Sequence, residues 1–198
     1  MLLYDSPVSG NCYKVRLLLA QLGRDYERHE VDVVDRSNRE QLLGGLNPAL
    51  SVPTLVLDDG RALAESNAIA FYLAQGSDYL PAEPFARAKV LQWLFFEQYS
   101  HEPYIAVVRF LVALADPPGS ESEIEWRRKA GYRALDALER ELSTREFLVD
   151  GRYTIADIAL YAYTHVAHEG GFELSRYPAI GAWLARVAAQ PGHVPIGA

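Results

Sequence analysis

The chain has 198 residues, which is enough for a full hydrophobic core and for one or two domains. Its formal net charge of -7 argues against a nucleic-acid-binding surface, and its apolar fraction of 49% is ordinary for a globular protein. A single cysteine excludes an internal disulfide framework. The sequence shows no signal-peptide pattern and no apolar run of membrane-spanning length, from which we expect a cytoplasmic protein.

The chain opens with an apolar stretch at residues 2–4, which predicts a short strand, followed by a helix with Val15, Leu18 and Leu22 at helical spacing. Ser9 lies between the two elements. The first N–H groups of a helix have no partner within the helix, so this place favours anions. A hydroxyl there can donate to a bound thiolate and help to keep it ionised. The alternative interpretation is that Ser9 only caps the helix.

Residues 51–57 predict a turn that enters an apolar strand, with Pro53 at the strand's first residue or at an edge. A cis Val52–Pro53 bond fits such a turn. Residues 58–60 predict a hairpin turn, residues 61–64 a return strand, and Glu65-Ser66 the start of a helix. The order of strand, helix, strand, short helix, hairpin and helix predicts a thioredoxin-like module, in which helices cover a small mixed sheet.

After residue 76 the pattern becomes wholly helical, and two prolines punctuate a linker that ends at residue 84. We therefore expect an α/β thioredoxin-like domain at 1–76 and an all-helical bundle at 84–198. Within the bundle, a long helix is expected to break or kink near Pro103. Thr154 and Asp157 predict a capping box at the start of a buried helix, a structural role rather than a catalytic one.

Four motifs occur in an order and spacing that resemble those of the cytosolic glutathione transferases over the whole chain. They are Ser9 six residues before Val15, Val52-Pro53, Glu65-Ser66, and the run from Gly151 to Asp157. Serine-type members of that family place a catalytic hydroxyl where Ser9 stands. Ser9 followed two residues later by Asn11 resembles the bacterial Nu-type transferases and their yeast Ure2-like relatives, as does the Gln-Trp pattern within residues 91–95.

The resemblance implies glutathione as co-substrate, no metal, and Ser9 and Asn11 as the catalytic residues. Val52 would offer its backbone to the cysteinyl unit, Ser66 would bind the γ-glutamyl carboxylate, and Glu65 would receive the ammonium. The glycyl carboxylate usually meets a basic or amide side chain, for which Arg39 and Asn38 are candidates. The lysine that many members carry before Val-Pro is absent at residues 47–51. The residues expected to bind glutathione are Ser9, Asn11, Arg39, Ser51, Val52, Pro53, Glu65 and Ser66.

The helical domain would contribute the pocket for an electrophile. Its candidate residues are aromatic, namely Tyr99, Tyr104, Phe110 and Trp126, with His101 a further candidate. The alternative is that these aromatic side chains, at helical spacing, form core. The histidines at 101, 165 and 168 do not form a convincing metal set. Cys12 has no cysteine partner, which leaves a buried structural thiol or a redox role.

Two functions from different classes remain open at this point. The first is an enzyme that activates glutathione for attack on an electrophile, a disulfide or a peroxide, as a detoxification enzyme would. The second is a glutathione-transferase-like binding or regulatory protein without catalysis. The presence of Ser9, Glu65 and Ser66 favours the enzyme. The resemblance also implies a homodimer, with no nucleic acid and no membrane among its partners.

Overall fold

The chain divides after Gln75 into two structural units in a computed structural model that describes all residues from 1 to 198. The first unit contains Met1–Gln75 together with Pro191–Ala198, and the second contains Gly76–Gln190. The domains expected from the sequence, 1–76 and 84–198, differ from these units in two respects, because residues 76–83 group with the second unit and the last eight residues group with the first. None of the helices has the length and hydropathy needed to cross a membrane.

The first unit is built on a mixed four-stranded sheet in the order β2-β1-β3-β4. The strands are β1 (Leu2–Asp5), β2 (Glu27–Glu30), β3 (Thr54–Val56) and β4 (Ala62–Ala64). Strand β1 pairs in parallel with β2 and antiparallel with β3, and the β3–β4 hairpin completes the sheet. Leu3 and Leu55 are opposite each other in register and both are fully buried. The mixed sheet expected from the sequence is therefore confirmed.

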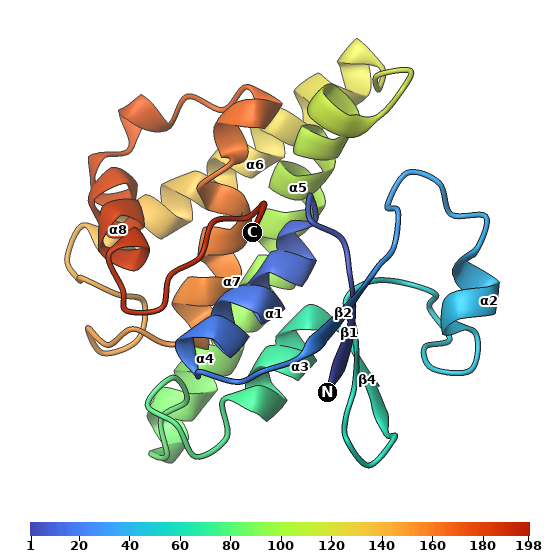
Figure 1. Cartoon of the computed structure of the whole chain (residues 1–198). Helices are drawn as coiled ribbons and strands as arrows, with labels where there is room; N and C mark the ends of the chain where they lie inside the picture. The colour runs from blue at the N-terminus through green and yellow to red at the C-terminus, as the bar shows by residue number, and fades with distance from the viewer. The chain divides into compact units, whose positions relative to one another are not determined.

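Three helices accompany this sheet: α1 (Gly10–Gln21), α2 (Arg39–Leu43) and α3 (Ser66–Leu73). Figure 1 shows α1 and α3 together on one face of the sheet, with α2 on the other side. In α3, Ile69 and Leu73 are buried, as their spacing predicts, but Tyr72 is 43% exposed. This eight-residue helix buries a narrow face, and position 72 lies at the rim of that face.

The second unit is wholly helical, as expected. Its elements are α4 (Pro84–Phe96), a π-helical turn at Glu97–His101, α5 (Glu102–Arg109), a second π-helical turn at Phe110–Leu114, α6 (Glu121–Leu142), α7 (Ile155–Thr164), two 3-10 turns at Ala167–Gly170 and Leu174–Arg176, and α8 (Pro178–Ala188). The irregularity expected near Pro103 is the first π-helical turn, which ends just before that proline. Proline supplies no N–H to the helix, and its ring clashes with the carbonyl four residues earlier in the chain.

Helix α7 forms the core of the second unit, since all ten of its residues are buried and it packs against α4, α5 and α8. Thr154 and Asp157 form a reciprocal capping box at its start. The Asp157 carboxylate accepts from the N–H groups of Thr154 (2.9 Å) and Leu148 (3.1 Å) and from the indole of Trp183 (3.0 Å). One carboxylate thus joins the start of α7 to the preceding loop and to α8.

Candidate functional site

Ser9 is held at the start of α1 by two local hydrogen bonds. Its N–H donates to the Ser6 carbonyl (3.1 Å), and its Oγ accepts from the Cys12 N–H (3.3 Å). The helix-capping interpretation of Ser9 is thus correct, but it does not exclude the chemical one. The bond to Cys12 uses a lone pair of the oxygen, so the hydroxyl hydrogen remains to donate to a bound sulfur.

Asn11 and Ser66 join the start of α1 to the start of α3. The Ser66 hydroxyl donates to Asn11 Oδ1 (3.3 Å) and accepts from the ammonium of Lys14 (3.3 Å), which also reaches Asn67 Oδ1 (3.5 Å). Lys14 is fully buried. The sequence analysis missed Lys14, although it lies three residues after Asn11 and therefore on the same face of α1.

Glu65 precedes α3 in a strained backbone conformation, with φ at 67°. A non-glycine residue in this region typically costs about 1–3 kcal/mol, and such strain clusters at ligand clamps. The Glu65 carboxylate is exposed and does not cap the helix, and no acidic residue lies in the first turn. The first N–H groups of α3 and the nearby charge of Lys14 therefore favour an anion at Ser66.

The loop before β3 carries Val52 in a bend. The Asn47 side-chain amide donates to the Ser51 carbonyl (2.9 Å) and to Thr54 Oγ1 (3.0 Å), which holds this loop in place. The Val52–Pro53 peptide bond is cis, which fits the turn expected there. The N–H and C=O of Val52 form no hydrogen bond within the chain. They are thus available to pair with an extended peptide, and Asn47 is a second supporting residue that the sequence analysis missed.

The Arg39 guanidinium donates hydrogen bonds to backbone carbonyls of its own unit. Its two amino groups donate to the carbonyls of Leu50 (3.0 Å) and Asp32 (3.0 Å), and the residue is 5% exposed. Asn38 stands at the N-cap of α2 without a side-chain capping bond. Arg39 therefore braces the segment between β2 and β3, and its contact with a glycyl carboxylate stays a prediction.

Cys12 is fully buried in the first turn of α1, three residues after the N-cap Ser9. Burial raises the pKa of its thiol to about 12, because desolvation and the nearby Asp5 charge outweigh the hydrogen bonds at Ser9 and Ser6. The thiol is therefore protonated at neutral pH and is a poor nucleophile. Of the two interpretations left open for Cys12, the environment favours the structural one.

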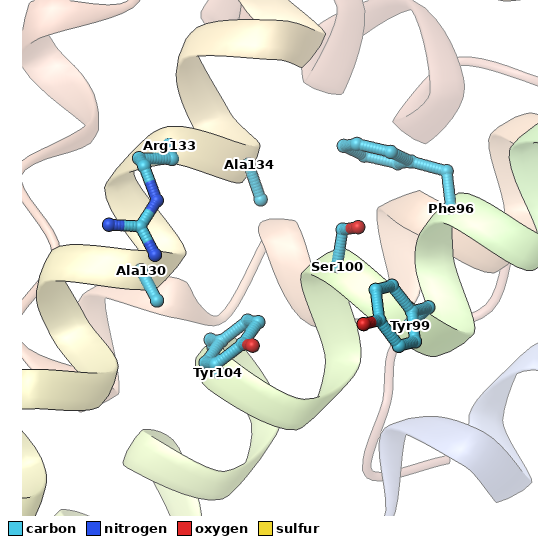
Figure 2. A pocket seen from close by; sticks show the side chains of 7 residues that line it. All are labelled: Phe96, Tyr99, Ser100, Tyr104, Ala130, Arg133 and Ala134. Carbon is cyan, nitrogen blue, oxygen red and sulfur yellow. The ribbon is translucent and has the colours of Figure 1, made fainter.

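The predicted electrophile residues lie in the second unit, but not around one cavity. Tyr99 and Tyr104 line a shallow depression of about 230 Å³ opposite α6, with Arg133 on the far side (Figure 2). Trp126 packs edge-to-face on Tyr104, with ring centroids 6.0 Å apart, and is 60% exposed. Phe110 does not line the depression. Three of the four residues are thus gathered on one side of the unit.

The histidines of the second unit have structural surroundings. His101 is fully buried, and its Nε2 lies 2.9 Å from Thr164 Oγ1. His165 bonds through Nδ1 to the Tyr161 carbonyl (2.8 Å) and stacks on the Tyr161 ring. No three His, Cys, Asp or Glu side chains converge in a way that could hold a metal ion.

Comparison with known proteins identifies the family. The model of the glutathione S-transferase N-terminal domain matches residues 3–79, and that of the C-terminal domain matches residues 92–191. A crystal structure of glutathione S-transferase from Pseudomonas fluorescens is 52% identical, covers 98% of both chains and superimposes with a TM-score of 0.93.

Two curated relatives show the breadth of the similarity. Glutathione S-transferase 3 of Zea mays is 29% identical, over 96% of this chain and 89% of its own length. The disulfide-bond oxidoreductase YfcG of Escherichia coli is 28% identical, over 96% of this chain and 90% of its own length. With both domain models matched in order and the fold shared along the whole chain, this protein belongs to the glutathione S-transferase family.

Proposed function

We propose that the chain binds glutathione in its first unit and stabilises the thiolate for attack on a second substrate. The observation that carries this proposal is the hydrogen bond between Ser66 and Asn11, which joins the starts of α1 and α3. It brings the helix that begins after Ser9 beside the helix that begins after Glu65. A thiol donor site and an anion site are thereby combined in one unit.

Each part of the tripeptide has a proposed anchor. Val52, whose backbone groups are unused, pairs with the cysteinyl unit as an added strand would. Ser66 and the first N–H groups of α3 bind the γ-glutamyl carboxylate, and Glu65 receives the γ-glutamyl ammonium. Arg39 with Ser51 borders the glycyl end, and Pro53 fixes the direction of the chain at Val52.

The chemistry follows from the ionisation of the thiol. A free thiol has a pKa of about 8.5, so only a minority is ionised at neutral pH, and the thiolate is the nucleophile. A hydrogen bond from the Ser9 hydroxyl, supported by the positive start of α1, stabilises the charged form. Lowering the pKa by about one unit requires roughly 1.4 kcal/mol. Asn11 is the second proposed catalytic residue, through its place beside Ser66.

Two reactions are open to this thiolate. It can displace a leaving group at an electrophilic carbon, forming a thioether. It can also attack one sulfur of a disulfide, forming a mixed disulfide while the other sulfur departs as a thiolate. The similarity to a disulfide-bond oxidoreductase supports the second reaction. We propose that Tyr99 and Tyr104, with Trp126 packed on Tyr104, contact the second substrate in either case, and a contact with Phe110 stays a prediction.

The alternative function is a binding or regulatory protein without turnover. Such a protein would need neither turnover nor the Ser9 hydroxyl. The hydroxyl hydrogen that remains after Ser9 caps the helix favours the enzyme. The family resemblance also supports a homodimer, a cytoplasmic location and a detoxification role as proposals. A monomer mass in light scattering at micromolar concentration would contradict the dimer.

The deciding experiment combines binding with turnover. Calorimetric titration with glutathione should show saturable binding, and the ultraviolet absorbance of the thiolate against pH should give a bound pKa well below that of the free thiol. Turnover is then compared between a chlorodinitrobenzene and hydroxyethyl disulfide. No saturable binding at millimolar glutathione contradicts the enzyme and favours the binding or regulatory protein. Binding with an unshifted thiol pKa and no turnover supports the binding protein instead.

A further inference from the structure

The last residues of the chain return to the first unit and run beside α1 (Figure 1). Gly192 sits so close to α1 that an added Cβ would lie 3.1 Å from Gln21 Cα. The buried Tyr13 donates its hydroxyl hydrogen to the Val194 carbonyl (2.6 Å), and its oxygen lies 3.2 Å from His193 Nε2. The segment is thus bound to α1 by specific contacts, although several of its residues remain exposed.

Arg16 connects this segment to the turn that carries Ser9. The side chain is buried, and its Nη1 donates to Asp5 Oδ1 (2.5 Å) and to the Ser6 carbonyl (3.0 Å). Its Nη2 donates to the Pro7 carbonyl (3.1 Å) and to the Ile196 carbonyl. Three of these acceptors therefore belong to the segment just before Ser9, and the fourth belongs to the C-terminal segment.

The geometry of Ser9 depends on one of these acceptors. The Ser6 carbonyl that accepts from Arg16 also accepts from the N–H of Ser9. A guanidinium is a rigid planar fork, so the positions of all its acceptors determine its orientation together. Removing the Ile196 carbonyl leaves Nη2 bonded to Pro7 alone and opens a buried cation to water. A shift of the Arg16 guanidinium then changes the position of Ser9 through the Ser6 carbonyl, to which both residues donate.

We infer that residues 193–196, which we name the C-terminal strap, position the Ser9 hydroxyl through Arg16. Arg16 is a positioning residue, because it does not contact the sulfur itself. The inference rests on the proposed function, in which Ser9 donates to the glutathione thiolate. The strength of that hydrogen bond depends on its length and direction, so a displaced Ser9 raises the pKa of the bound thiol.

Two shortened chains test this inference. One ends at Pro195 and lacks the Ile196 carbonyl. The matched control ends at Gly197, which keeps that carbonyl in a peptide bond and loses only Ala198, whose backbone oxygen accepts from Arg28 (2.9 Å). The readouts are the pKa of the bound thiol, kcat and the KM for glutathione, with melting temperature recorded for each chain.

We expect the chain ending at Pro195 to raise the pKa of the bound thiol by about half a unit, which lowers the thiolate fraction about threefold below that pKa. Its kcat at neutral pH should fall by about the same factor, with the KM for glutathione changed less, because the strap acts on the sulfur rather than on the anchors. The control should behave as wild type. Arg16→Lys, which keeps the charge but not the fork, should raise the thiol pKa in the same direction.

The possible outcomes separate the two proposals. If wild type lowers the thiol pKa and the chain ending at Pro195 lowers it equally, the strap has no positioning role and the inference is overturned. An equal rise in both shortened chains also overturns it, since the Ile196 carbonyl is then not the cause. If wild type itself neither binds glutathione nor shifts the thiol pKa, the proposed function fails and the inference fails with it.

Discussion

Helices α1 and α7 both begin with a hydroxyl residue, yet their two starts are built in opposite ways. At α7, Thr154 is fully buried and its cap is completed by Asp157, whose carboxylate accepts from four donors on three residues. At α1, Ser9 is half-buried, no acidic residue lies in the first turn, and one capping bond is formed. The start of α7 is closed by its own chain, and the start of α1 is left open.

The difference teaches what a helix start can be used for. Closing all the orphan N–H groups stabilises the fold and leaves nothing for a ligand. Leaving them open sacrifices some stability and keeps donors directed at a bound anion. The start of α3 belongs with the open kind, because Glu65 forms no capping bond there and its backbone is strained. The proposed site thus has two open helix starts side by side.

The largest expected effect is on stability at the closed start. Asp157→Ala removes the acceptor of four donors in a buried place and should lower the free energy of unfolding by about 2–5 kcal/mol. Turnover per folded molecule should stay at the wild-type value. Denaturant unfolding and active-site-normalised turnover measure the two effects. A normal unfolding curve with lost turnover would give Asp157 a catalytic role and contradict its structural role at the start of α7.

Ser120→Ala is the matched control for that variant. Ser120 also caps a helix, accepting from the Glu123 N–H (3.4 Å), but it is exposed. Water can replace the lost bond there, so we expect a loss of only about 0.5–1 kcal/mol. Equal losses in the two variants would mean that burial of the cap contributes nothing.

The pH dependence of the closed start should be the next largest effect. Burial raises the pKa of Asp157 from 3.8 to about 6, although its hydrogen bonds act in the opposite direction. Between these values the folded chain keeps a proton that the unfolded chain has released. The stabilising contribution of Asp157 is therefore full below about pH 4 and decreases as the pH rises through about 6, by about 1–3 kcal/mol.

This decrease is measured as the difference in unfolding free energy between wild type and Asp157→Ala at pH values across that window. The difference removes the contributions of the other carboxyl groups, which both chains share. We expect the difference in unfolding free energy between wild type and Asp157→Ala to decrease as the pH rises. A difference that increases would show that the hydrogen bonds to the carboxylate outweigh its desolvation.

At the open start the expected effect is on chemistry. Ser9→Ala should raise the pKa of the bound thiol by about one unit, which lowers turnover about tenfold below that pKa. Loss of the capping bond to Cys12 should cost about 1 kcal/mol of stability. Ser9→Thr keeps the hydroxyl and is the control. An unchanged thiol pKa in Ser9→Ala would contradict a role of Ser9 in stabilising the thiolate and make Asn11 the first candidate for that role.

The smallest effect should distinguish strain from charge at Glu65. Glu65→Gly relieves the positive φ and should raise the free energy of unfolding by up to about 1 kcal/mol, while it weakens glutathione binding. Glu65→Gln keeps the strain and loses the charge, so it should weaken binding without any gain in stability. Chemical denaturation and calorimetric titration measure the two quantities. Destabilisation by glycine would show that the backbone at Glu65 is not strained.

Much of the fold and part of the candidate site could be predicted because they are encoded locally. Strands β1, β3 and β4 follow from short apolar segments and their turns, whereas the charged and exposed β2 (Glu27–Glu30) has no such local signal. Thr154 and Asp157 are three residues apart, so a helix start brings them together wherever it occurs. Ser9 was identified in the same way, from the change between strand and helix. The helical second unit follows from spacing, and even the break near Pro103 comes from a single residue's missing N–H.

The sequence by itself therefore determined the elements, their caps and the likeness to the family, all of which depend on neighbours a few residues apart. Only the tertiary structure decided which distant residues meet. Lys14 and Ser66 are separated by 52 positions, and Arg16 and Ile196 by 180. No spacing encodes such pairs, because they result from the packing of whole helices against a sheet. The strain at Glu65 is likewise imposed by its surroundings, since a glutamate alone does not favour a positive φ.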